Sequence, residues 1–292
     1  MKEKIKNLLK KAKPYSAGFF MGILIWLIIN YPKVKEQFLV DKFETIEDIK
    51  EYATKASKLL DQNLINQIAE VKKYVAENLP ENLNMSKEEV IDTLNKVVII
   101  PVGKKNYDHM QDDIGAMYIY GEDLDLEMIF LNKIYLKESR LKYTLIHELY
   151  HFIDRRRDTS KTEEYNNAVK ILLDTTISED RFKKILYFVL KNDLNRISKN
   201  FGKNETNKLL DDWYTDFNKH KRENYFFSKE EIYARLNTLK YKILSPSKDK
   251  KITSDNFLKF VKTIRIDDDF SEMFYCVLLL NNINNIELLN EI

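Results

Sequence analysis

Residues 147–151 read His-Glu-Leu-Tyr-His, so two histidines stand four residues apart and a glutamate follows the first. Residues four apart lie on one face of a helix, so His147 and His151 can direct two ring nitrogens at one point. A zinc ion held there can keep a position open for water. Glu148 is offset from that face and can reach the water rather than the metal. The pattern predicts a catalytic zinc site with His147 and His151 as ligands and Glu148 as the general base.

The residues around this motif predict that its helix is buried. A buried polar side chain is costly unless it is satisfied, and a bound metal satisfies the two imidazoles. The alternative is a helix with two partly buried histidines and a solvated glutamate. The apolar flanks are Leu141, Leu145, Ile146, Leu149, Phe152 and Ile153.

A catalytic zinc ion usually takes three protein ligands and one water, so one ligand is still to be found. The remaining histidines, His109 and His220, stand in a polar loop and a basic stretch, which favours a carboxylate instead. The acidic residues that follow the motif are Glu163, Glu164, Asp174, Glu230 and Glu231.

Two segments together resemble the gluzincin branch of zinc metallopeptidases. They are His147-Glu-Leu-Tyr-His-Phe-Ile-Asp154 and the later Glu231-Ile-Tyr-Ala-Arg-Leu. The Asp after the second histidine and the Glu-x-x-Ala segment look like the anthrax lethal factor and Pro-Pro endopeptidase type. This resemblance implies that Glu231 is the third ligand, on a helix whose Ala234 permits close packing. It also implies that Tyr225 polarises the substrate carbonyl.

Two of these roles have structural alternatives. Ser228 and Glu231 have the spacing of a capping box, in which Glu231 would bind backbone and Glu230 would become the candidate ligand. Asp154 shares the helical face of the two histidines and could orient an imidazole N–H from outside the ligand set. Asp154 could instead pair with Arg157, three residues further along the helix.

The segment from Pro14 to Pro32 carries no charged residue and is long enough for a transmembrane helix. Six lysines precede it against one acid, whereas the charges after it are mixed. This asymmetry predicts a single-pass anchor with the N-terminus inside and the catalytic part outside the cytoplasm. A cleaved signal peptide and a buried core helix are the alternatives. The former lacks a small-residue cleavage site, and the latter rarely lacks polar residues on every side.

Composition narrows the class of protein. With 48 Lys and Arg against 46 Asp and Glu, the net charge of +2 gives no reason to expect a nucleic-acid partner. Only 6 Gly and 5 Pro beside 32% charged residues favour a mostly helical protein. The single cysteine, Cys276, excludes an intramolecular disulfide and a cysteine-based zinc cluster.

The pattern of elements predicts an α+β, mostly helical, zincin-like domain with a small sheet directly before the motif helix. A substrate could lie extended along an edge strand of that sheet. We expect strands at 97–102, 115–120 and 127–131 and the motif helix at 137–157. The expected organisation is a basic juxtamembrane segment at 1–13, the anchor at 14–32, packing helices or a stalk at 33–85, the metallopeptidase domain at 86–245 and a helical extension at 246–292.

These observations predict a membrane-anchored, zinc-dependent metalloendopeptidase that acts on a peptide or protein. Zinc would polarise the scissile carbonyl and activate a water, and Glu148 would pass the water proton to the leaving amine. One alternative is a structural, virion-associated or membrane-associated interaction protein with a zincin-like domain. Another is a cell-wall metallohydrolase. The sequence predicts no oligomeric state.

Overall fold

The computed structural model describes residues 51, 60, 62–102, 115–121, 126–132, 140–158, 170–172, 174–223, 227–246, 249–266, 270–282, 286, 289 and 290 of the 292-residue chain. Residues 55–292 form one compact unit. The predicted basic segment and membrane anchor, 1–13 and 14–32, lie outside the described residues. Among the helices that are described, none is both long and apolar enough to cross a membrane.

A three-stranded sheet precedes the motif helix, close to the predicted positions. It consists of β1 (Val98–Val102), β2 (Ala116–Gly121) and β3 (Leu126–Asn132), in the order β1-β3-β2. The central strand β3 is parallel to β1 and antiparallel to β2. Its residues 128–131 are at most 1% exposed. Because β2 is the last strand in this order, it is an edge strand of the described sheet.

The motif helix is α7 (Leu141–Asp154), and α5 (Gln62–Glu77) packs beside it. The apolar flanks predicted to be buried are all 0% exposed in α7. Lys142 on α7 forms an ion pair with Glu70 on α5 at 2.7 Å. The helix α6 (Lys87–Lys96) follows α5 in the chain and precedes the sheet. The spacing of Ser86 and Glu89 predicts a capping box at its start, and the structure confirms it.

The chain just after α7 is held by the segment that leads into α6. The backbone N–H of Asn84 donates to the Arg156 carbonyl, and the N–H of Asp158 donates to the Asn82 carbonyl, both at 2.7 Å. Leu83 and Arg157 form an isolated antiparallel bridge. These bonds fix the C-terminal end of the motif helix.

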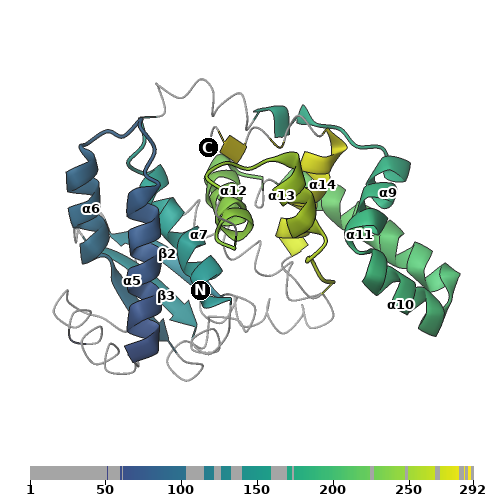
Figure 1. Cartoon of the computed structure of the whole chain (residues 1–292), viewed down its shortest axis with the longest axis horizontal. Coiled ribbons are helices and arrows are strands. Elements are labelled where there is room, and N and C mark those ends of the chain that lie inside the picture. The colour runs from purple at the N-terminus through teal and green to yellow at the C-terminus, as the bar shows by residue number, and fades with distance from the viewer. Residues whose placement is uncertain are drawn as a thin grey trace, which may run out of the picture. The chain divides into compact units, whose positions relative to one another are not determined.

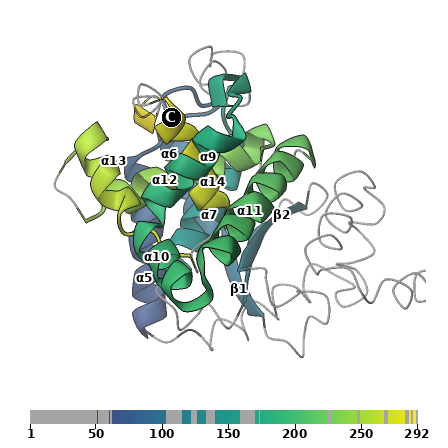
Figure 2. The ribbon, with the colours of Figure 1, turned by 90° about the vertical axis from the view of Figure 1, so that its right-hand side faces the viewer.

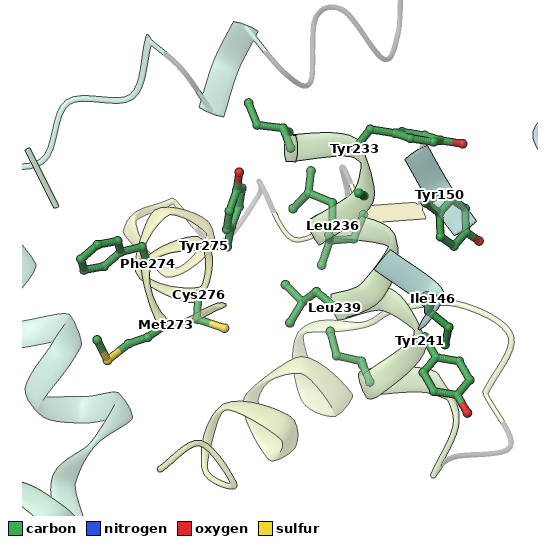
Figure 3. Packing of buried hydrophobic residues seen from close by; sticks show 14 of the residues in the cluster. Ile146, Tyr150, Tyr233, Leu236, Leu239, Tyr241, Met273, Phe274, Tyr275 and Cys276 are labelled. Carbon is green, nitrogen blue, oxygen red and sulfur yellow. The ribbon is translucent and has the colours of Figure 1, made fainter. Parts of the chain in front are cut away.

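A second helix, α12 (Lys229–Leu244), packs against α7 along most of its length, and α14 (Phe270–Asn281) covers its other side. Figure 3 shows Leu236 and Leu239 of α12 on the side of Tyr275 and Cys276 in α14, whereas Tyr233 lies toward Tyr150 of α7. The rings of Tyr150 and Tyr233 meet edge to face, with centroids 5.6 Å apart. The helix α13 (Ser254–Val261) contacts α12 as well.

Beyond α14 lie α9 (Glu179–Val189), α10 (Lys191–Phe201) and α11 (Lys203–Glu223) (Figures 1 and 2). Gly202, with φ of 94°, joins α10 to α11 in a conformation that only glycine adopts readily. The acidic and aromatic stretch at 211–217 lies within α11. The amphipathic pattern of residues 165–199 predicts Phe188 as a core residue, which is wrong, because it is 47% exposed on α9.

The described part of the chain is thus α+β and mostly helical, with one small mixed sheet placed before the motif helix. This coarse prediction from the sequence is confirmed. The motif helix lies between the sheet and α12, which is the arrangement that determines the site described next.

Candidate metal centre

His147 and His151 lie one turn apart on α7 and direct their rings at a common point. Their Nε2 atoms are 3.1 Å apart, and the rings meet edge to face with centroids 4.7 Å apart. Two nitrogen lone pairs repel each other at this distance. The two atoms therefore either share a proton or face a common cation. Both side chains are partly buried, at 16% and 17% exposed.

The third donor comes from α12, at a position far from the motif in sequence. The carboxylate of Glu231 lies against both imidazoles, with Oε2 3.5 Å from Nε2 of His147 and Oε1 3.4 Å from Nε2 of His151. Ser228 caps the helix, and its hydroxyl accepts a hydrogen bond from the backbone N–H of Glu231 at 3.3 Å. The backbone of Glu231 thus contributes to the cap while its carboxylate faces the histidines.

The three side chains offer donor atoms within 4.8 Å of one another. Four ligands around zinc, each at roughly 2.0–2.1 Å, would lie about 3.3 Å apart in a tetrahedral set. The contacts of 3.1, 3.4 and 3.5 Å are close to that separation. Two imidazoles and one carboxylate also form a donor set that zinc accepts in catalytic sites. The residues present therefore fit a zinc ion.

The charges of the site favour an ionised Glu231. Burial raises the pKa of its carboxyl, but Arg235 and His147 outweigh that effect and bring the pKa well below its usual range. Burial alone would lower the pKa of His151. The carboxylate of Glu231, which is bonded to the ring, outweighs this effect, so the pKa of His151 is raised. Carboxylate and imidazole thus stabilise each other's charged forms.

Glu148 is 7% exposed and is not one of the three residues whose donor atoms converge. Its Oε2 accepts a hydrogen bond from the backbone N–H of Tyr118 in β2 at 2.7 Å. The carboxylate is therefore held between the motif helix and the edge strand, beside the three donors.

Asp154 pairs with Arg157, which was the alternative to a role in orienting an imidazole. Its Oδ1 accepts from Nη2 of Arg157 at 2.7 Å and from Nε at 2.9 Å. The guanidinium of Arg157 also lies over the ring of Tyr233, 3.8 Å from the centroid, and so joins the end of α7 to α12. Asp154 acts on His151 through its charge, which raises the imidazole pKa.

Among the described residues, no other candidate joins this group of three donors. Tyr225, His109, Glu163 and Glu164 lie outside the described residues, so the role predicted for Tyr225 stays a prediction. Glu230 lies on α12, and it is exposed to solvent. His220 lies on α11, where its ring is 6.4 Å from that of Phe274.

Sequence reasoning missed two residues of the site, Tyr118 and Arg235. Arg235 donates from Nε to Oε2 of Glu231 at 3.0 Å, and its position four residues after Glu231 was a usable signal. Tyr118 contributes only its backbone N–H, and no side-chain pattern marks such a group.

Comparisons with known proteins identify no relative. No protein-family model, no curated protein and no solved structure matches this chain.

Proposed function

We propose that this protein is a membrane-anchored, zinc-dependent endopeptidase of the gluzincin type. The observation that carries the proposal is the meeting of His147, His151 and Glu231, from two helices, at separations of 3.1 to 3.5 Å. These three residues would hold the metal. When bound, zinc polarises a carbonyl oxygen and lowers the pKa of water toward neutrality.

Glu148 is the residue we assign to proton transfer. It follows His147 directly in the chain, and its carboxylate is 7% exposed and tied to the backbone of β2. One oxygen accepts the Tyr118 N–H, which leaves the other to take a proton from water and deliver it to a leaving amine. A residue that served only the fold would not need to be an acid at this position.

The edge strand supports a peptide as the substrate. Asn132 N–H donates to the Gly115 carbonyl at 2.9 Å, and hydrogen-bonded pairs recur at every second residue of an antiparallel ladder. Residues 116, 118 and 120 therefore direct their backbone groups away from β3. Within the described sheet, that outer side of β2 pairs with no strand. An extended peptide that paired there would lie next to Glu148.

The membrane anchor is proposed from the uncharged stretch between Pro14 and Pro32 and the lysines that precede it. The catalytic part would then face the extracytoplasmic side. Such an enzyme would act on peptide segments of proteins at or beyond the membrane surface.

The proposal is tested with a peptide library and the full-length protein in detergent. We expect cleavage within the peptides that a chelator stops and added zinc restores. We expect none from Glu148→Gln, which retains the shape of the side chain and an acceptor for the Tyr118 N–H. Cleavage by Glu148→Gln at the wild-type rate would exclude the proposed mechanism. Absence of bound metal in the wild-type protein would exclude the zinc enzyme as a whole.

A further inference from the structure

Arg235 contacts the candidate ligand Glu231 from one helical turn away on α12. Its Nε donates to Oε2 of Glu231 at 3.0 Å, and the two side chains are 16% and 12% exposed. Residues four apart share a helix face, so this contact follows from the spacing. The carboxylate therefore has a guanidinium partner within its own helix.

The same guanidinium is attached to a second helix. Nη1 of Arg235 donates to the hydroxyl of Ser271, which lies in the first turn of α14 and is 1% exposed. Arg235 thus links the ligand carboxylate on α12 to the helix on the far side of α12 from the histidines. Because it is held at both ends, the guanidinium has a defined position beside Glu231.

The two oxygens of Glu231 have different partners. Oε2 accepts from Arg235 and lies 3.5 Å from Nε2 of His147, whereas Oε1 lies 3.4 Å from Nε2 of His151. The terminal torsion of a glutamate is broad, so a free carboxylate samples many orientations. The hydrogen bond from Arg235 to Oε2 restricts that torsion and keeps both oxygens directed at the imidazoles.

We propose that Arg235 is a positioning residue for the metal centre, one that fixes the Glu231 carboxylate so that its two oxygens face the two histidine nitrogens. This inference rests on the proposed function, because it assumes that Glu231 is a metal ligand. Ser271 has a supporting part, since it holds the outer end of the guanidinium.

The charge of Arg235 and its positioning role have opposite effects on metal affinity. A cation beside the site repels a metal ion, so removal of the charge alone would tighten binding. Loss of a partner that orients a ligand weakens metal binding, typically by about 10–100-fold. The sign of the change therefore distinguishes the two effects.

The experiment measures zinc affinity in the full-length protein by competition with a chromophoric chelator. The variants are Arg235→Gln, Arg235→Lys and Ser271→Ala. The control is Lys242→Gln, because Lys242 lies on the same helix, is 17% exposed and pairs with Glu272 of α14. Melting temperature is followed for every variant. The visible spectrum of bound Co²⁺ reports the ligand geometry, which a purely structural effect would not change.

We expect Arg235→Gln to weaken zinc binding by about 10–100-fold. Arg235→Lys retains the charge but not the planar donor, and should also weaken binding. Ser271→Ala should have a smaller effect of the same sign, and Lys242→Gln should match the wild type. The Co²⁺ spectrum should shift in the Arg235 variants alone.

Unchanged or tighter zinc binding in Arg235→Gln would overturn the inference while the proposed function stood. An equal loss in Lys242→Gln would overturn it too, because the effect would then belong to the packing of α12 on α14. If Arg235→Gln does not fold, Arg235→Lys and Ser271→Ala decide the question by the same criterion. A wild-type protein that binds no zinc overturns the proposed function and this inference together.

Discussion

The carboxylate of Glu148 accepts a hydrogen bond from the backbone N–H of Tyr118 at 2.7 Å. This contact joins the residue that we assign to proton transfer to the edge strand on which we place the substrate. Because Tyr118 directs its backbone groups away from β3, the position of the acid is set by the sheet as well as by the motif helix. The same strand would therefore position both Glu148 and a peptide paired with β2.

The first prediction separates chemistry from metal binding. Glu148→Gln should retain zinc at the wild-type stoichiometry and lose peptide cleavage by about 100-fold or more, since Glu148 transfers a proton and is not a ligand. Zinc content by elemental analysis and cleavage rates on the same samples check this. Loss of zinc with the fold intact, seen by circular dichroism, would mean that Glu148 has another role.

The second prediction compares two adjacent glutamates. Glu231→Gln should lose most of the bound zinc, because one of three ligands is weakened and the carboxylate charge is removed. Glu230→Gln is the matched control. That side chain is exposed, and its loss should change stability by no more than about 0.5 kcal/mol and leave the zinc in place. Equal zinc contents in the two variants would place the third ligand elsewhere.

The sequence predicted local features well because they depend on local periodicity. The four-residue spacing of His147 and His151 required a helix, and the apolar residues around them required that helix to be buried. The packing of α12 against the motif helix could not be predicted in this way. Glu231 is far along the chain, and only packing of α12 on α7 brings it to the histidines. The spacing of residues within a short segment does not predict a contact between two such distant segments.

Other features could not be predicted from the side-chain pattern. The N–H of Tyr118 meets Glu148 because of the register between β2 and β3, and a shift of one residue would turn it toward β3 instead. Phe188 was misassigned because a helix that packs on one side leaves some apolar residues outside the buried stripe.

The third prediction concerns Ala234, which is 0% exposed on α12. Ala234→Leu would add atoms where α12 packs within the core, and overpacking of this kind costs about 1–3 kcal/mol. Because the ligands come from both α7 and α12, we also expect weaker zinc binding. Urea unfolding and chelator competition measure the two effects. Full zinc affinity at reduced stability would show that helix separation does not affect the ligand geometry.

The fourth prediction addresses the anchor. Deletion of residues 1–32 should move the protein from the membrane fraction to the soluble fraction, whereas deletion of 1–13 alone should leave it with the membrane. Wild-type protein recovered uncleaved in the soluble fraction would contradict the anchor. In sealed, right-side-out vesicles, added protease should degrade residues 33–292, and their protection would contradict the orientation.

The fifth prediction uses Lys72, which lies on α5 and binds the end of α6. Its Nζ donates to the carbonyls of Asn95 at 3.1 Å and Val97 at 3.0 Å. Burial lowers the pKa of Lys72 from 10.5 to about 8. Between these two values the unfolded chain binds the proton and the folded protein does not, so stability from this residue rises with pH.

We therefore expect the stability of the wild type relative to Lys72→Met to increase from pH 7 to pH 9.5, by on the order of 1 kcal/mol. Urea unfolding at several pH values measures this difference. Lys73→Met is the control for the loss of one lysine from α5, because its side chain is 76% exposed. The comparison removes the contributions of tyrosines and other groups, which all three proteins share. A difference for Lys72→Met that is constant, or that shrinks as the pH rises, would show that the lysine is not desolvated at the α5–α6 contact.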